Sequence, residues 1–360
     1  MKILTVVGAR PQFIKAAPVS EVLIQAGIEE HLLHTGQHYD TNMSDVFFKE
    51  LGLRLPNINL AVGSGSHAQQ TAMMLVGVEK ALIEQRPDWL LVYGDTNSTL
   101  AGVVAASKLN VPVAHVEAGL RSFNRRMPEE INRIVADALA TLLFTPTETA
   151  SNNLFREGIP SERVVQTGDV MLDACLMFRD RAFKQSKVLS QFALPEKGYI
   201  LATIHRAENT DDNVKLSAIA SGLDQVASQV PVLLPLHPRT RHRLSALRMG
   251  EFKNLRIVEP LGFLDMLRAE AGAALIVTDS GGVQKEAFFH KVPCITLREE
   301  TEWIELIELG WNTLCDPISS EIIVQTVLSK LGTVGSEAFP YGSGNAAEII
   351  VKALAGSTGA

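Results

Sequence analysis

Cysteine is scarce in this chain. Its three cysteines, Cys175, Cys294 and Cys315, lie far apart and form no CxxC pair. This spacing argues against a disulfide framework and against a thiolate zinc site. It is also typical of proteins that work in a reducing cytoplasm, which is where we expect this protein to act.

Long hydrophobic runs are missing as well. No segment reaches the length of a membrane span, so we expect no membrane partner. The apolar N-terminal stretch 3–9 is interrupted by Arg10-Pro11, which leaves it too short for a signal peptide.

Positive charge is in deficit. The chain has 33 Lys and Arg against 40 Asp and Glu, a formal net charge of −7. This balance argues against a nucleic-acid partner, and any anionic ligand has to be held by local basic groups. Apolar residues, in contrast, make up 46% of the 360 residues. Because single cores stop growing at roughly 250–300 residues, we expect two domains.

Short apolar, β-rich segments alternate with longer helical patterns along the whole chain. This alternation predicts parallel sheets with helices on both faces, in an α/β protein of two doubly wound, Rossmann-like domains separated by a cleft. The expected strands are 3–7, 31–34, 89–93, 113–116 and 142–144 in the first domain, and 199–203, 232–236, 256–258, 275–277 and 293–297 in the second.

Several residues signal the ends of helices. Pro11 suits a first helical turn and Gly27 a helix end. Ser66 and Gln69 have the spacing of a capping box for a helix that runs toward Gln85.

The domain limits follow from the order of these elements. A helical stretch from 170 to about 187 leads into the second series of strands, and a tail helix from about 345 has no strand of its own. We expect this tail to fold back on the first domain. The first domain is therefore predicted at 1–168 plus 345–360, and the second at 169–344.

The segment 274–286 predicts a phosphate site. An apolar run ends at Thr278-Asp279-Ser280-Gly281-Gly282 and resumes with helical spacing, which indicates strand, glycine turn and helix. Glycines let backbone N–H groups approach an anion, and the positive end of the helix points to the same place. Glu286, about one turn into the helix, can accept both hydroxyls of a ribose. A plain strand-to-helix connection is the alternative.

Polar residues follow most of the expected strands. In open α/β sheets ligands bind beyond the carboxyl ends of the strands, which makes these residues candidates for a site. The candidates are Gly8-Ala9-Arg10-Pro11 with Lys15, Gln37-His38, Gly94-Asp95-Thr96, Glu117-Ala118-Gly119-Leu120-Arg121, His205-Arg206 and His237-Pro238-Arg239.

Each candidate cation or acid has a structural alternative. Arg10 and Lys15 are either phosphate ligands or solvated basic residues. Asp95 either takes part in chemistry or caps a helix that begins near residue 98. Glu129 follows Pro128, where an acidic side chain offsets the helix dipole. Glu117 ends an apolar strand and has no capping duty, which favours a role in chemistry.

The histidines that follow strands, His38, His205 and His237, have structural alternatives too. The sequence contains no HxH or HExxH spacing, so we expect no metal site.

Six separated motifs occur in a fixed order: Gly8-Ala9-Arg10-Pro11, Gly94-Asp95-Thr96, 115–121 (HVEAGLR), Pro128-Glu129-Glu130, His205-Arg206 and Asp279-Ser280-Gly281-Gly282. In these motifs the chain resembles, nearly end to end, the non-hydrolysing UDP-N-acetylglucosamine 2-epimerases. The resemblance implies a fold of the glycosyltransferase-B type with the nucleotide in the interdomain cleft. It also implies a homodimer and no redox cofactor or metal.

The resemblance assigns roles position by position. It implies catalytic roles for Asp95, Glu117, Glu129 and His205; it places the UDP phosphates on Ser280, Gly281, Gly282 and Arg10, helped by Lys15, and the ribose on Glu286. It also implies a reaction in which UDP is eliminated to give a 2-acetamidoglucal and is added back after protonation from the opposite face.

The proposed chemistry explains these residue types. The C2 hydrogen is barely acidic, so departure of UDP has to weaken its bond first or concurrently. Arg10, the helix dipole behind Gly282 and His205 would stabilise charge on the leaving group. Two carboxylates on opposite faces would remove and return the proton, which we assign to Asp95 with either Glu117 or Glu129.

The chain also departs from the family pattern. Arg206 is followed by Ala207, and Thr301-Glu302-Trp303 stands where many members have Thr-Glu-Arg-Pro. These features are similar to the branch that acts on UDP-2,3-diacetamido-2,3-dideoxyglucuronate. The residues Gln37, His38, Gln69, Arg206 and His237 are candidates for a second, activating substrate site or for contacts with the sugar.

Three other functions compete with epimerisation. A glycosyltransferase can have the same fold, since fold alone fixes no chemistry. A hydrolysing epimerase would release UDP and free N-acetylmannosamine, and a UDP-sugar sensor would bind without turnover.

Overall fold

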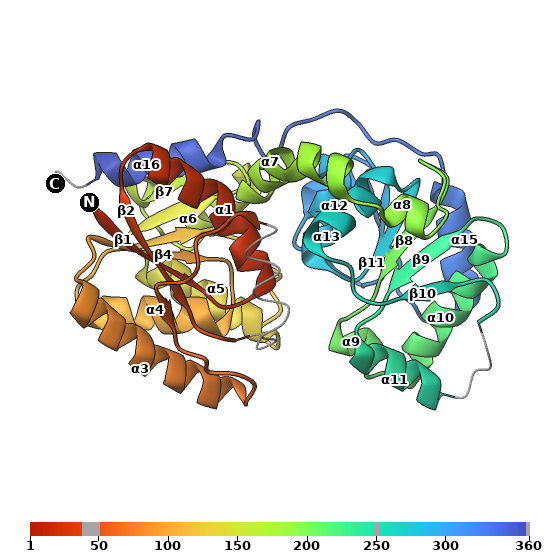
Figure 1. The fold of residues 1–360 in the computed structure, drawn as a ribbon, viewed down its shortest axis with the longest axis horizontal. Helices are drawn as coiled ribbons and strands as arrows, with labels where there is room; N and C mark the ends of the chain where they lie inside the picture. The colour runs from red at the N-terminus through yellow and green to blue at the C-terminus, as the bar shows by residue number, and fades with distance from the viewer. Residues whose placement is uncertain (38–50, 248–251, 358–360) are drawn as a thin grey trace. The chain divides into compact units, whose positions relative to one another are not determined.

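The computed structural model describes residues 1–37, 51–247 and 252–357. It divides into two compact units, of which unit 1 comprises Met1–Met177 and Phe339–Ala360, and unit 2 comprises Phe178–Ala338. Figure 1 shows that each unit is built on a sheet with helices on both of its faces. The domain limits expected from the sequence, 168/169 and 344/345, stay predictions.

The sheet of unit 1 is parallel and has, within the described ranges, the strand order β3-β2-β1-β4-β5-β6-β7. Its strands are β1 (Lys2–Val7), β2 (Glu29–His34), β3 (Ile58–Asn59), β4 (Trp89–Tyr93), β5 (Val113–Val116), β6 (Leu142–Thr145) and β7 (Val164–Gln166). The five strands expected from the sequence are confirmed, and β3 and β7 are additions. The order reverses direction between β1 and β4, which is the switch point where doubly wound sheets bind ligands.

The helices of unit 1 are α1 (Arg10–Gln25), α3 (His67–Gln85), α4 (Asn97–Lys108), α5 (Pro128–Leu139), α6 (Glu148–Arg156), the 3₁₀ turn η1 (Ser161–Arg163), α7 (Val170–Gln185), which runs into unit 2, and α16 (Ala346–Gly356). In Figure 1, α3, α4 and α5 cover one face of the sheet, and α1 and α16 cover the other.

The sequence signals for helix ends are largely confirmed. Pro11 lies in the first turn of α1, and the Ser66 hydroxyl accepts a hydrogen bond from the Gln69 N–H at 3.3 Å, completing the capping box of α3. The structural alternative for Asp95 is wrong, because the side chain of Thr96 caps α4 instead.

The tail helix α16 packs on the sheet of unit 1. Helix α16 lies against α1 on the first sheet, and the Ala347 N–H donates to the Asp173 carboxylate over 2.8 Å. The contact ties the end of the chain to the beginning of α7 within unit 1.

The sheet of unit 2 is also parallel, with the order β10-β9-β8-β11-β12-β13 among its described residues. Its strands are β8 (Ile200–Thr203), β9 (Val232–Pro235), β10 (Arg256–Val258), β11 (Leu275–Thr278), β12 (Cys294–Thr296) and β13 (Asn312–Leu314); its helices are α8 (Val188–Gln191), α9 (Ala207–Thr210), α10 (Asn213–Ala227), α11 (Pro238–Ala246), α12 (Phe263–Gly272), α13 (Gly281–Phe289), α14 (Ile304–Glu308) and α15 (Ser320–Lys330).

The second sheet is buried on both faces. Ile200 and Ala202 of β8 belong to one apolar cluster, which they share with α10 and α15. Leu201 and the preceding Tyr199 belong to another, shared with α12 and α13. Because side chains alternate across a strand, this division shows why the sequence of β8 is continuously apolar.

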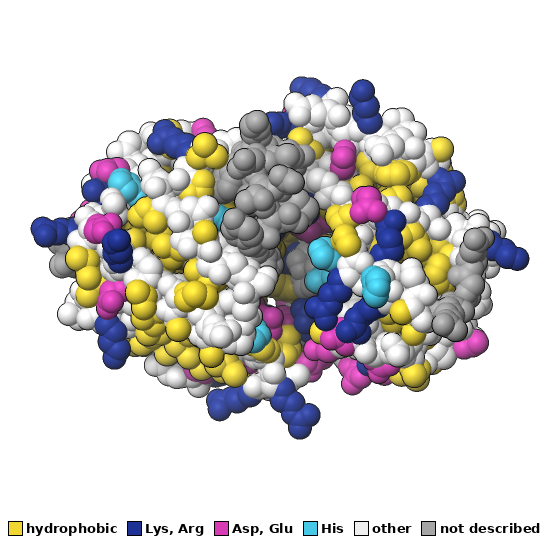
Figure 2. Space-filling model, turned by 60° about the horizontal axis from the view of Figure 1, so that its bottom comes forward, with side chains coloured by type: hydrophobic (Ala, Val, Ile, Leu, Met, Phe, Trp, Pro, Cys, Tyr) yellow, Lys and Arg dark blue, Asp and Glu magenta, His cyan; other side chains and the backbone are white. Residues whose placement is uncertain are grey.

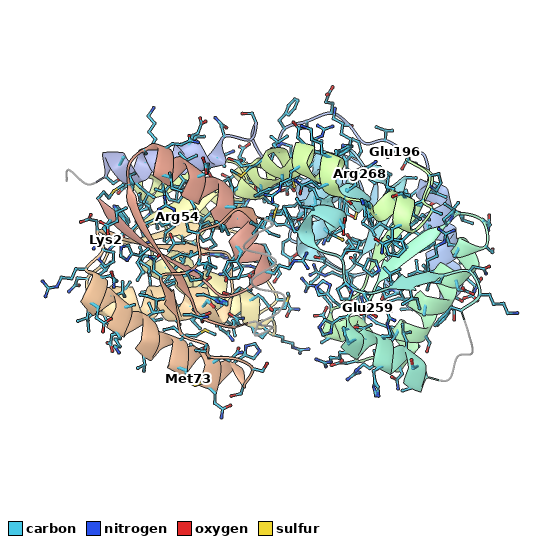
Figure 3. The ribbon with its side chains drawn as sticks, viewed as in Figure 1. Lys2, Arg54, Met73, Glu196, Glu259 and Arg268 are labelled. Atoms are coloured by element: carbon cyan, nitrogen blue, oxygen red, sulfur yellow. The ribbon has the colours of Figure 1, made fainter. Side chains whose placement is uncertain are left out.

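The surface is mostly polar, with isolated apolar side chains. Figure 3 shows Met73, which is 48% exposed, on the outer side of α3, and it shows Arg268 and Glu196 side by side in an ion pair on unit 2. None of the helices in the described ranges is long and apolar enough to cross a bilayer.

Candidate active site

The loops after β1 and β4 are held together by Gln12. This side chain is buried in the first turn of α1, and its Oε1 accepts hydrogen bonds from the N–H groups of Gly8 and Ala9 at 2.8 and 3.1 Å. Its Nε2 donates to the Tyr93 carbonyl and the Thr96 hydroxyl at 2.7 and 2.9 Å. The two strand ends at the switch point of unit 1 are thereby fixed before any ligand binds.

Glu117 lies at the end of β5 in an unusual backbone conformation. Its φ of 68° is in the left-handed region, which non-glycine residues rarely adopt and which is concentrated at functional sites. Its carboxylate forms an ion pair with Lys15 of α1, and the side chains are only 9% and 10% exposed. The structure therefore turns one carboxylate out of a strand and holds it on a buried cation.

Asp95 is oriented by α5. The Arg133 guanidinium donates to its Oδ2 from Nε at 2.9 Å and from Nη2 at 2.6 Å, while Asn132 donates to its backbone carbonyl at 2.8 Å. The Asp95 side chain remains 29% exposed. Its carboxylate is thus both fixed in direction and accessible.

Glu130 fixes Arg133 in turn. The Glu130 carboxylate is almost fully buried; it accepts from Arg133 Nη1 at 2.9 Å and from the N–H groups of Ser122 and Phe123 at 3.0 Å. Burial raises the pKa of Glu130, but the hydrogen bonds from Ser122, Arg133 and Phe123 outweigh it and hold the pKa below its ordinary value. The neighbouring Glu129 is exposed in the first turn of α5.

Unit 2 contributes a histidine that is oriented by a buried carboxylate. The side chain of His205 is 56% exposed, and its Nδ1 lies 3.1 Å from Oδ1 of Asp279, which is fully buried. Asp279 also accepts hydrogen bonds from the backbone N–H groups of His205 and Arg206 at 3.1 Å. Burial raises the pKa of Asp279, but the contacts with His205 and Arg206 lower it below its ordinary value. Because Nδ1 faces Asp279, Nε2 is the ring nitrogen of His205 that points away from this buried carboxylate.

The glycine turn begins α13 as predicted. Ser280 is its N-cap residue, and Gly281 and Gly282 are the first two helical residues. An added Cβ would find no atom closer than 3.8 Å at Gly281 or 3.9 Å at Gly282, and neither glycine has a positive φ. Internal packing therefore does not require glycine at these positions, and the backbone of the turn is open to close approach by a ligand.

The other expected UDP-binding residues lie around these two sheet edges. Arg10 is the first residue of α1 and is half-buried, and Glu286 is half-buried in α13. The Arg206 guanidinium reaches within 3.8 Å of the position that a Gly281 Cβ would occupy. Figure 2 shows basic and histidine side chains close together on part of the surface of unit 2.

The residues expected at a second site or at the sugar lie in different elements and make different local contacts. Gln37 accepts hydrogen bonds from the Ser98 hydroxyl and N–H at 2.8 and 3.2 Å, and Gln69 belongs to the capping box of α3. His237 caps α11 by accepting from the Arg239 N–H at 3.3 Å. His38 lies outside the described residues.

The roles of several residues of this arrangement were not identified from the sequence. Asp279 was noted only as part of the glycine-turn motif, although it follows an expected strand and the rule that pointed to Glu117 could have found its role. Gln12, Asn132 and Arg133 lie within helices, and no local pattern distinguishes them from other helical polar residues.

No group of three or more His, Cys, Asp or Glu in the described part of the chain is arranged to hold a metal ion. Each of the three cysteines is buried and takes part in no disulfide.

The comparisons with known proteins agree with this architecture. Residues 21–355 match the family model described as UDP-N-acetylglucosamine 2-epimerase. The chain belongs to this family. It is therefore an isomerase, and the resemblance predicted from the six motifs is confirmed.

Two relatives span the full length of the chain. A UDP-2,3-diacetamido-2,3-dideoxy-D-glucuronate 2-epimerase of Pseudomonas aeruginosa is 48% identical over 99% of this chain and 99% of its own. A UDP-N-acetylglucosamine 2-epimerase of Methanocaldococcus jannaschii is 43% identical over 98% of this chain and 99% of its own.

Solved structures of family members confirm the glycosyltransferase-B type of fold. The crystal structure of the M. jannaschii enzyme in complex with UDP-GlcNAc and UDP matches with a TM-score of 0.92 at 43% identity, covering 99% of this chain and 100% of that one. The Neisseria meningitidis enzyme bound to UDP-GlcNAc matches with a TM-score of 0.91 at 30% identity, with the same coverage.

Proposed function

We propose that this epimerase interconverts UDP-N-acetylglucosamine and UDP-N-acetylmannosamine by inversion at C2. The observation that carries the proposal is Glu117, a carboxylate at the end of β5 in a left-handed conformation and paired with the buried Lys15. The family membership and the UDP-GlcNAc bound in two solved relatives support this substrate.

The proposed reaction has two halves. In the first, a carboxylate takes the proton from C2, the bond between C1 and the phosphate oxygen breaks with its electron pair going to UDP, and a C1–C2 double bond forms. In the second, C2 is protonated from the opposite face while the phosphate oxygen adds back to C1. We assign the two proton transfers to Asp95 and to either Glu117 or Glu129.

We propose that UDP is held mainly by unit 2. The backbone N–H groups of Gly281 and Gly282 lie at the start of α13, where the helix dipole favours the charge that develops on the leaving diphosphate. The Ser280 N–H already donates to the Thr278 hydroxyl at 2.9 Å, so Ser280 would contribute its hydroxyl instead. The outer edge of His205 would donate to the same charge. Arg10 would add a cation, and Glu286 would accept the ribose hydroxyls.

Lys15 is proposed to act chiefly on Glu117. The ion pair holds the carboxylate in place, and the position in α1, the helix that follows β1, also allows Lys15 to help with the phosphates.

A second candidate substrate is UDP-2,3-diacetamido-2,3-dideoxyglucuronate. The 48% identity with the P. aeruginosa relative favours it. So does Trp303, which stands where many family members have arginine. The Lys285 ammonium lies over the Trp303 ring, 4.1 Å from its centroid. The indole Nε1 of Trp303 lies 3.9 Å from the position that a Gly281 Cβ would occupy. The chain thus departs from the Thr-Glu-Arg-Pro pattern of many family members at a residue that lies beside the glycine turn Ser280-Gly281-Gly282.

Incubation with each UDP-sugar in D₂O tests the proposal. Deuterium at C2 of both epimers of UDP-N-acetylglucosamine is expected, and the ratio of kcat/KM between the two sugars identifies the preferred one. Accumulation of free N-acetylmannosamine would indicate a hydrolysing epimerase instead. Binding without turnover of either sugar would favour a sensor. Transfer of the sugar to an acceptor would indicate a glycosyltransferase.

We further propose that the enzyme is a cytoplasmic homodimer and that Gln37, His38, Gln69, Arg206 and His237 contribute to an activating site or to sugar contacts. Sedimentation and the dependence of rate on substrate concentration test these two points.

A further inference from the structure

His115 is a fully buried histidine in β5, two residues before Glu117. Its Nε2 lies 2.8 Å from the backbone carbonyl of Gly94, and its Nδ1 lies 2.8 Å from Oδ1 of Asp137. A carbonyl oxygen and a carboxylate both accept hydrogen bonds, so both ring nitrogens have to donate. Two protons on the ring make it an imidazolium.

The charges around His115 balance only in that form. Asp137 also accepts from Arg121 at 2.7 Å, and Arg121 pairs with Glu157 at 2.7 Å. Two cations and two carboxylates then form a neutral cluster, whereas a neutral imidazole would leave the cluster with a net negative charge, shared between the buried Asp137 and Glu157, whose side chain is 40% exposed. Burial raises the pKa of Asp137, but the contacts with His115 and Arg121 lower it below its ordinary value.

This cluster fixes both turns that carry the candidate catalytic carboxylates. The turn before Asp95 is held on one side by His115, which binds the Gly94 carbonyl, and on the other by the Gly94 N–H, which donates to the Val116 carbonyl at 2.9 Å. The turn after Glu117 is held by Asp137, whose second oxygen accepts from the Gly119 N–H at 3.1 Å.

The two turns lie close together and have left-handed backbones. Gly94, Glu117 and Gly119 have φ values of 61°, 68° and 80°. An added Cβ at Gly94 would lie 3.1 Å from the Glu117 carboxylate. A shift of either turn would therefore move one carboxylate relative to the other.

We propose that His115, as an imidazolium bound to Asp137, is a positioning residue that holds Asp95 and Glu117 in register for proton transfer at C2. The inference rests on the proposed function, since it gives a role to the carboxylates named there. His115 itself touches no substrate atom in this scheme.

Nitrogen-15 NMR of the wild-type protein at neutral pH tests the imidazolium directly. We expect both ring nitrogens of His115 to carry a one-bond coupling to a proton. A single protonated nitrogen would overturn the proposal, and this measurement needs no variant that has to fold.

Substitution tests the positioning role. In H115Q, kcat is expected to fall by about 10²-fold, the loss typical of misplaced catalytic groups, with KM and UDP affinity little changed. Amide exchange at Gly94 and Gly119 should become faster. D137N, which keeps the side-chain shape, should show the same pattern. H31Q is the matched control, because His31 lies in β2 and contacts the exposed Glu29 instead.

The outcomes separate this inference from the proposed function. Unchanged kcat and unchanged amide exchange in both folded variants would overturn the positioning role. If the wild-type protein turned over neither UDP-sugar, the proposed function would fail, whereas the coupling and exchange measurements would still decide whether His115 holds the two turns.

Discussion

The candidate groups of unit 1 and unit 2 are prepared for their ligand in opposite ways. In unit 1 the carboxylates of Asp95 and Glu117 are already paired with protein cations. In unit 2 the side chain of His205 is largely exposed, and among the described residues no atom outside the turn lies closer than 3.8 Å to an added Cβ at Gly281. The comparison teaches that the acids are oriented by the fold, whereas the backbone of the turn is left open.

Glycines illustrate the same difference. At Gly8 of unit 1 an added Cβ would lie 2.0 Å from the Ser98 hydroxyl oxygen and 2.2 Å from that of Thr35. Gly282 of unit 2 has no neighbour within 3.8 Å of its Cβ position. The first glycine is therefore needed for packing, and the second leaves space over the helix start.

Removing a unit 1 carboxylate should have the largest effect. E117Q keeps the side-chain size but loses the ionised oxygen that transfers the proton, so kcat should fall by about 10²- to 10⁴-fold while UDP affinity persists. Steady-state kinetics and calorimetry with UDP measure the two quantities. E148Q, a change at an exposed glutamate in the first turn of α6, is the control. Full activity of E117Q would contradict the assignment.

The histidine of unit 2 should be next in effect. Because Asp279 orients His205, H205N and D279N should each lower kcat by about 10²-fold, and the double variant should lose little more than either single one. A double-mutant cycle on kcat measures this coupling. Additive losses would show that the two residues act separately.

The two glycines provide a direct contrast between stability and binding. G8A should lower the free energy of unfolding by about 1–3 kcal/mol through overpacking. G282A should leave stability unchanged but weaken UDP binding by about tenfold, which corresponds to ~1.4 kcal/mol. Denaturant unfolding gives the free energy of unfolding of each variant, and UDP titration gives its affinity for UDP. The contrast fails if G282A destabilises the fold as much as G8A.

The last prediction concerns Glu130 and the free energy of unfolding. E130Q places an amide among N–H donors and should lower the free energy of unfolding by about 1–3 kcal/mol at neutral pH. The folded pKa of Glu130 is depressed, so its contribution is complete above the unfolded pKa and disappears as the pH falls through the folded pKa. The difference between E130Q and wild type should therefore shrink in acid. A difference that does not depend on pH would show that charge is not its source.

The sequence predicted the central strands well because their apolar runs are continuous. It missed β3, β7 and β13, which are edge strands of two or three residues and carry polar side chains such as Asn59, Gln166 and Asn312. Edge strands bury less surface, so their sequences carry little of the pattern on which such predictions depend.

The candidate site was predictable in the same uneven way. Residues directly after strands, such as Glu117 and His205, follow from the geometry of parallel sheets. The partners of Asp95 and His115 do not, because Arg133 and Asp137 lie within a helix and meet the strand ends only through the fold. The sequence also left open whether Asp95 caps a helix; in the structure the cap of α4 is Thr96, one residue beyond Asp95.

Breakage of the bond between C1 and the phosphate oxygen is the central claim, and positional isotope exchange tests it most directly. UDP-N-acetylglucosamine labelled with ¹⁸O in that bridging position should, during turnover, distribute the label into the non-bridging oxygens of the β-phosphate. Epimerisation with the label retained entirely in the bridge would contradict elimination of UDP.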